Sequence, residues 1–143
     1  MLKRIGKRLK DQRGLTLVEL LAVVVILGII AAIAVPSIGG IIEKSKEDAV
    51  KAEAVQVLNA AKLYTASNNV VGSITLSQGT AAGTGVGNLD NFLDNPGPYS
   101  ITITNTAGNV DYTAVSVTKN NITMTFATEQ VVLDGKPTTT TKK

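Results

Sequence analysis

The chain has 143 residues, a formal net charge of +3, and neither cysteine nor histidine. This length allows one small domain beside an N-terminal helix, and the missing residue types exclude disulfides, thiolate metal sites and the commonest general base. Six of the 14 basic residues lie within residues 1–14, where the one acid is Asp11. The basicity is therefore a targeting feature of the N-terminus and argues against direct binding of nucleic acid. We expect no cofactor, no metal ion and no enzymatic activity.

Residues 15–42 form an apolar segment whose one charged residue is Glu19. As a helix, this segment is long enough to cross the ~30 Å hydrocarbon core of a membrane. The basic residues 1–14 would hold its start in the cytoplasm and leave the C-terminal part outside. A carboxylate within a spanning helix costs up to ~3.5 kcal/mol on insertion scales, so Glu19 is expected to have a partner. A cut between Gly14 and Leu15 would create an α-ammonium four residues from Glu19, or on the same residue of a neighbouring copy.

The N-terminal sequence resembles that of type IV pilins and pseudopilins over about residues 10–45. The shared features are a basic leader ending in Gly14, the sequence LTLVELL from Leu15 with its Glu19, and Gly28 and Pro36 inside the apolar run. The resemblance implies that a prepilin peptidase cleaves after Gly14 and N-methylates Leu15, and that Glu19 guides docking into a filament. It also implies local melting of the helix between Gly28 and Pro36 upon assembly, where the proline by itself predicts a kink. Leu15 stands where the family more often has phenylalanine.

Three other interpretations of the apolar segment stay open. A secretory signal peptide would be cut after Ala32-Ile33-Ala34, but this interpretation leaves Gly14 and Glu19 without a role. An ordinary single-span anchor would carry Glu19 by accident. A buried helix of a soluble protein would need more chain than follows it here, because the helix is apolar on every side.

The sequence becomes amphipathic after residue 42, so we expect the helix to continue over residues 43–68 as the first part of a head domain, residues 43–135. Its apolar side chains recur at three- and four-residue spacing, which is typical of one buried helix face. They are Val50, Ala54, Val57, Ala61 and Tyr64. Asn68-Asn69 ends this pattern.

Residues 69–98 are rich in Gly, Ser, Thr and Asn and are interpreted as an exposed loop, with one helical turn near Leu89–Leu93. Four aspartates in and beyond this loop are candidate calcium ligands, because the resemblance to major pseudopilins implies that a calcium ion could bind here. They are Asp90, Asp94, Asp111 and Asp134. Because they lack the tight spacing of a calcium loop, we interpret them as solvated.

Residues 99–135 show period-two patterning that predicts three strands joined by short hairpins, with a change of phase between Tyr112 and Val115. Gln130–Leu133 is expected to add a fourth, edge strand, and residues 136–143 to form a flexible tail. The predicted fold class is α+β, with the long N-terminal helix packed on a small antiparallel meander of three or four strands.

The predicted function is that of a structural subunit, a pilin, of a type IV pilus-like extracellular filament. A pseudopilin of a type II secretion or DNA-uptake system is the alternative, and a single-span membrane-anchored binding domain is a further one. By the resemblance, the partners are copies of the same chain in a helical filament, prepilin peptidase, the pilus assembly machinery of the membrane and, before assembly, the lipid bilayer. The expected location is the cytoplasmic membrane with the C-terminus outside, and then the extracellular filament.

Overall fold

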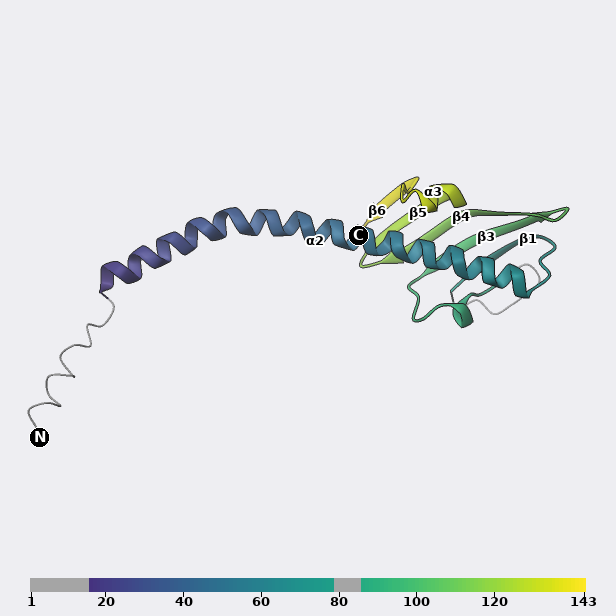
Figure 1. The fold of residues 1–143 in the computed structure, drawn as a ribbon, viewed down its shortest axis with the longest axis horizontal. Helices are drawn as coiled ribbons and strands as arrows, with labels where there is room; N and C mark the ends of the chain where they lie inside the picture. Colours follow the sequence, from purple (N-terminus) through teal and green to yellow (C-terminus); the bar gives the residue numbers. More distant parts are fainter. Residues whose placement is uncertain (1–15, 79–85) are drawn as a thin grey trace, which may run out of the picture. The chain divides into compact units, whose positions relative to one another are not determined.

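The structure, a computed structural model, describes residues 16–78 and 86–143. It divides into two compact units with the boundary between Ile42 and Glu43. The first unit contains the apolar half of helix α2 (Leu17–Ser67), and the second contains the rest of α2 and the described strands (Figure 1). We call the second unit, residues 43–143, the head. The predicted cleavage residues Gly14 and Leu15 lie outside the described residues.

Helix α2 continues through Pro36, which lies inside it without an N–H to donate to the carbonyl one turn back. The helix ends at Ser67, beside the asparagine pair of the sequence. There the backbone N–H and the side-chain amide of Asn68 both donate to the carbonyl oxygen of Tyr64, at 2.9 and 3.0 Å. These bonds satisfy a carbonyl that the end of a helix would otherwise leave without a partner.

The described residues of the head form a six-stranded sheet in the order β2-β1-β3-β4-β5-β6. Its centre is an antiparallel meander of β3 (Tyr99–Thr106), β4 (Asn109–Lys119) and β5 (Ile122–Thr128). Both hairpin turns have positive φ at two consecutive residues, Ala107-Gly108 (53° and 92°) and Asn120-Asn121 (53° and 64°). This backbone geometry matches the twist of the flanking strands. The predicted α+β fold with a helix on an antiparallel meander is confirmed.

The change of phase in β4 corresponds to a β-bulge. Ala114 has a φ of 51°, and the register between β3 and β4 shifts at this point. The extra residue moves the following side chains back to the core face, so Tyr112 and Val115 are both buried.

The prediction of an exposed loop over residues 69–98 is wrong in part. Within it, β1 (Gly72–Ser77) pairs antiparallel with β3, and the short β2 (Val86–Gly87) pairs parallel with β1. Only Ile74 and Leu76 give β1 an apolar face among serines and threonines, so its pattern was too short to separate from a loop. The predicted helical turn is present as η1 (Asp90–Phe92).

Two predictions for the C-terminal part are also wrong. The expected fourth strand is instead the short helix α3 (Glu129–Leu133). Its Val132 is buried in the same core as the apolar face of α2. The valine pair suggested a strand, but packing against β4 and β5 overrides that propensity. The expected flexible tail forms β6 (Thr139–Lys142), which pairs antiparallel with β5 because threonine fits a pleated edge and Thr138 N–H donates to the Thr125 carbonyl at 2.7 Å.

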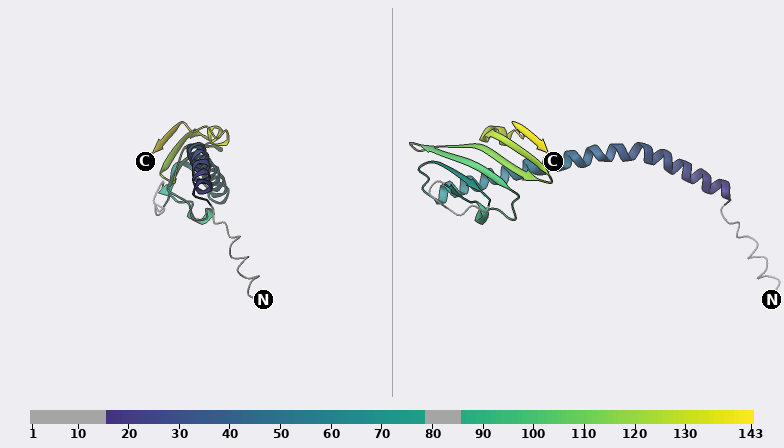
Figure 2. Two further views of the ribbon diagram at one scale, coloured as in Figure 1. Left: turned by 90° about the vertical axis from the view of Figure 1, so that its left-hand side faces the viewer. Right: turned by 180° about the vertical axis from the view of Figure 1, so that it is seen from behind.

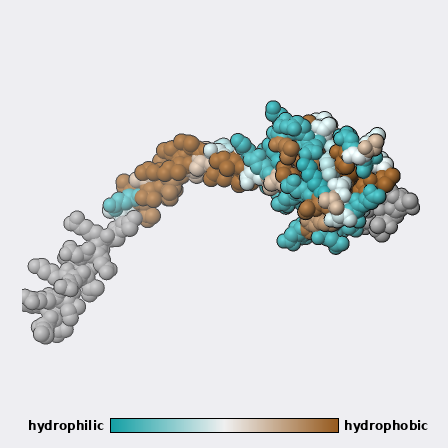
Figure 3. All heavy atoms as spheres, turned by 45° about the vertical axis from the view of Figure 1, so that its right-hand side comes forward, coloured by the Kyte–Doolittle hydropathy of each residue, from teal (hydrophilic) through white to brown (hydrophobic). Residues whose placement is uncertain are grey.

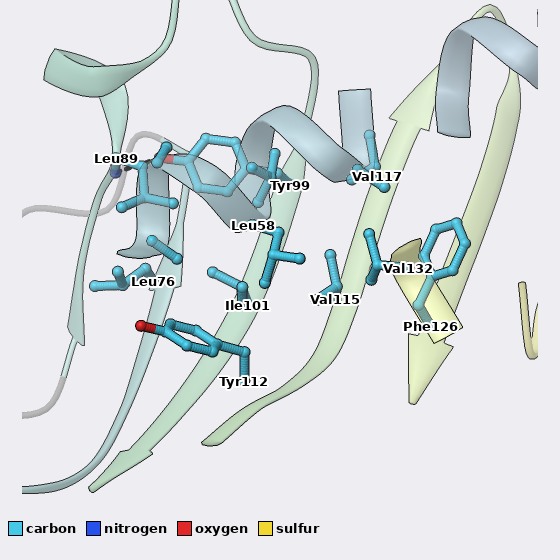
Figure 4. Close-up of a cluster of buried hydrophobic side chains, with 14 of the residues drawn as sticks. Leu58, Leu76, Leu89, Tyr99, Ile101, Tyr112, Val115, Val117, Phe126 and Val132 are labelled. Carbon is cyan, nitrogen blue, oxygen red and sulfur yellow. Dashed lines mark hydrogen bonds between the residues drawn. The ribbon is translucent and has the colours of Figure 1, made fainter. Parts of the chain in front are cut away.

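The head half of α2 lies across one face of the sheet, where it covers the apolar side chains of the strands (Figures 1 and 2). Figure 4 shows Leu58 of α2 between Leu76 of β1 and Phe126 of β5, all three with no exposed surface. Side chains of this size contribute ~1.5–3 kcal/mol each when they leave water, so α2 is an integral part of the head. The predicted stripe that starts at Val50 forms this contact.

Candidate functional site

The apolar half of α2 is exposed along its whole length. Its large apolar side chains, all of them within residues 17–42, range from 49 % exposed at Val23 to 82 % at Leu17. Figure 3 shows the side of the helix that faces the viewer as an almost continuous apolar surface. Among the described residues, α2 is the one helix long and apolar enough to cross a membrane. A surface of this kind requires lipid or other protein chains to cover it.

Glu19 is part of a reciprocal cap at the start of α2. Its Oε2 atom accepts hydrogen bonds from the backbone N–H and the hydroxyl of Thr16, both at 2.8 Å. In return, the Thr16 hydroxyl oxygen accepts from the backbone N–H of Glu19 at 3.2 Å. This is a capping box, which satisfies donors that a helix start leaves without intrahelical partners. Thr16 was missed from the sequence, although the spacing Thr-x-x-Glu before an apolar run is the signal for it.

The cap gives Glu19 a role within its own chain. The carboxylate lies in the first turn, near the positive end of the helix dipole, where an acid is favourable. A partner from a neighbouring chain would therefore add to these bonds. The docking role of Glu19 stays a prediction, as do cleavage after Gly14 and methylation of Leu15.

The other predicted residues of the apolar segment are Gly28 and Pro36. A Cβ atom added at Gly28 would meet nothing within 4 Å, so packing within this chain does not require a glycine there. Pro36 removes one intrahelical hydrogen bond from the same half of α2. Melting between these two residues stays a prediction.

The first turn of the head is tied to the last strand by an ion-pair cluster that the sequence did not reveal. Lys142 of β6 donates to Glu43 at 2.5 Å and lies 2.9 Å from a carboxylate oxygen of Glu47. The hydrogen bond from Lys142 lowers the pKa of Glu43. The pKa of Lys142 is raised, chiefly by its hydrogen bond to Glu43 and also by its hydrogen bond to Glu47. Lys142 lies on the C-terminal segment that was expected to be flexible, so no sequence pattern connected it to the helix.

A second missed carboxylate, Glu53, lies inside the head at 5 % exposure. Its Oε1 atom accepts the backbone N–H of Gly97 at 2.8 Å, and its Oε2 atom accepts from the ammonium of Lys119. A Cβ atom at Gly97 would lie 2.5 Å from the carbonyl oxygen of Thr118, so only glycine fits this approach. Glu53 therefore fastens the segment before β3 to α2.

The described residues contain no group of three or more His, Cys, Asp or Glu side chains that could hold a metal ion. Asp90 instead accepts a hydrogen bond at 2.8 Å from the hydroxyl of Tyr99, which in turn accepts the backbone N–H of Leu89 at 2.5 Å. Burial of its side chain raises the pKa of Tyr99 to about 12. Asp134 accepts from the side-chain amide of Gln130 at 3.0 Å. These aspartates have structural contacts within the head.

Residues 9–35 match a family model described as the prokaryotic N-terminal methylation motif. The chain is also similar to three curated proteins, each named type II secretion system core protein G. It is 39 % identical over 64 residues to the protein of Vibrio cholerae serotype O1, which is 45 % of this chain and 44 % of the relative. The values are 40 % over 60 residues for Aeromonas hydrophila (42 % of each chain), and 38 % over 58 residues for Pectobacterium carotovorum subsp. carotovorum (41 % of this chain, 37 % of the relative).

The chain thus spans less than half the length of the curated relatives it matches. No solved structure matches it significantly. The similarity concerns a motif and a limited stretch of chain. The residues that match the family model, 9–35, include Glu19 and part of the exposed apolar half of α2.

Proposed function

We propose that this chain is a member of the pilin and pseudopilin family and acts as a structural subunit that polymerises into a filament through residues 15–42. The proposal gives the chain no catalytic role. The observation that carries it is the apolar half of α2, exposed on every side and followed by a separate folded head. A helix that served only as part of a soluble core would be covered by its own chain.

The apolar half of α2 would have two successive environments. Each Leu, Ile or Val side chain is worth ~1.5–3 kcal/mol when it leaves water, so the segment stays in the membrane until other subunits replace the lipid. The basic residues 1–14 favour the cytoplasmic side for the N-terminus, which puts the head on the outer side of that membrane. The filament then takes the subunit out of the bilayer.

Processing would supply the charge that assembly needs. Cleavage after Gly14 gives Leu15 an α-ammonium, next to the capping box formed by Thr16 and Glu19. A neighbouring subunit's ammonium could then pair with Glu19 in a medium of low dielectric constant. Such a pair adds little net stability over an apolar contact, but leaving either charge alone would cost several kcal/mol, so the pair fixes the axial register between subunits.

The names of the similar proteins favour a pseudopilus of a type II secretion system over the extracellular type IV pilus expected first from the sequence. A DNA-uptake pseudopilin is the remaining member of this group. In each case the partners would be copies of this chain, a prepilin peptidase, the assembly machinery of the membrane and the bilayer itself.

The test is assembly that depends on the machinery. The chain is overproduced in cells that carry a type II assembly machinery and its prepilin peptidase, and in matched cells that lack the assembly ATPase. Filaments sheared from the first cells alone, and identified by mass spectrometry as this chain, are the expected result. A membrane-bound monomer in both cell types would refute the proposal and favour a single-span anchored domain.

A further inference from the structure

The head exposes few large apolar side chains. Among its described residues they are Leu63, Val71, Phe92 and Leu133, with exposed fractions of 56, 80, 37 and 51 %. Leu63 and Phe92 lie together in one groove, whereas Leu133 lies on another part of the head. A groove with exposed apolar walls, and an exposed leucine elsewhere on the same domain, form a potential complementary pair.

The groove lies between α2 and the segment around η1 and has a volume of about 350 Å³. Its lining is apolar and amide in character, with one acid. It consists of Gln56, Asn59, Ala60, Leu63, Phe92, Leu93 and Asp94. The Phe92 ring meets the Tyr64 ring edge-on with 6.2 Å between centroids. The backbone N–H of Phe92 donates to the backbone carbonyl of Leu89, a residue that is fully buried. The wall is thus held in place before any partner arrives.

Leu133 is the last residue of α3, and the contacts of its neighbours fix its position on the surface. The preceding Val132 is buried in the core, and two hydrogen bonds close the helix end, from Asp134 N–H to Gln130 at 2.9 Å and from Gly135 N–H to Val132 at 3.0 Å. The helix packs on β4 and β5. Figures 1 and 2 show α3 on one side of α2 and η1 on the other.

We propose that the groove between α2 and η1 receives Leu133 of a second copy of this chain, so that heads in a filament contact one another side to side. Because the two surfaces are different and lie on opposite sides of α2, one contact leaves a groove and a Leu133 unused, and the contact can repeat indefinitely. Asp94 at the groove and the exposed Lys136 near Leu133 have opposite charges, which favours this orientation. Asp134 on the same side carries a hydrogen bond from Gln130 of its own helix.

The size of the contact explains why the occupant is another copy. A groove for one or two side chains is far below the ~800 Å² per partner of a stable protein interface, so it cannot recruit an independent protein. It can act where another element already holds the partners together, as the apolar halves of α2 would. The inference therefore rests on the proposed function and adds the surface by which the heads align.

The chain contains no cysteine, so introduced pairs report one contact without background. The full chain carrying Leu63→Cys and Leu133→Cys is assembled in cells with the type II machinery, oxidised mildly and run on a non-reducing gel. We expect a ladder of dimers, trimers and longer species, because each subunit provides one of each site. Asn59→Cys with Leu133→Cys is the second variant, on the same wall of the groove.

The matched control pairs Val71→Cys with Leu133→Cys, since Val71 is equally apolar and more exposed but lies outside the groove. It should give no ladder, and each single variant should stay monomeric. Filaments whose groove pairs cross-link no more than the Val71 pair, or that yield dimers alone, would overturn the head contact and leave the proposed function standing. If the unsubstituted chain forms no filaments, the proposed function fails and the contact fails with it.

Discussion

Replacing Glu53 by alanine should destabilise the head by ~2–4 kcal/mol. The backbone N–H of Gly97 would lose its acceptor, and a buried donor without a partner costs ~1–3 kcal/mol, toward the low end here because the site is only partly buried. The Cγ methylene of Glu53, which alanine lacks, adds ~0.8 kcal/mol. Lys119 contributes little because its side chain is 47 % exposed and its ammonium can turn to water.

The assay is urea unfolding of the head fragment from Glu43 to Lys143, followed by circular dichroism. In thermal unfolding of the same fragment, a loss of this size would lower the Tm by ~10–25 °C for a domain of about 100 residues. Glu53→Gln keeps the size and an acceptor for the Gly97 N–H, so it should cost less than ~1 kcal/mol. Asp48→Ala on the same helix, where Asp48 is 57 % exposed, is the matched control and should be neutral. Equal losses for Glu53→Ala and Asp48→Ala would refute the assignment of Glu53 as a fastening residue.

Three further predictions concern the head and the start of α2. The fragment beginning at Glu43 should be a soluble monomer, whereas one beginning at Val70 should aggregate because it exposes the core face of the sheet; a stable, cooperatively unfolding Val70 fragment would contradict the packing described. Glu19→Ala should leave membrane insertion and cleavage intact while sharply reducing filaments in electron micrographs, and normal filament numbers would remove Glu19 from assembly. The raised pKa of Tyr99 means that the neutral phenol is favoured by folding, so head stability should hold up to about pH 10 and fall as pH approaches about 12; Tyr99→Phe should lessen that fall in urea midpoints measured across this range.

The sequence predicted the structure correctly wherever a regular hydrophobic pattern extended over many residues. The apolar run around Glu19, the helical stripe from Val50 and the alternating strands of the meander all extend over enough residues to identify their structure. The paired asparagines of the β4–β5 turn, Asn120-Asn121, also carried their own signal, because they tolerate positive φ.

What the sequence did not predict depends on contacts between distant residues. Strand β1 has only two apolar side chains, and it became a strand because β3 offers it a partner. Lys142 is held by Glu43, 99 residues earlier in the sequence, and Glu53 is held by the backbone of Gly97. No local sequence pattern predicts either pairing. Thr16 is different, since its capping spacing to Glu19 was visible in the sequence and was overlooked.

The N-terminus of the mature protein shows whether the apolar segment is kept for assembly or removed as a signal peptide. Assembly through residues 15–42 requires this segment to remain attached to the head, with a free α-amine beside Glu19. Mass spectrometry of the protein purified from cells with prepilin peptidase should therefore find a chain that begins with N-methylated Leu15, and Gly14 replaced by a bulky residue should leave the full precursor. A mature chain that begins at Val35 would mean that the apolar segment is a signal peptide, and it would contradict filament assembly through residues 15–42.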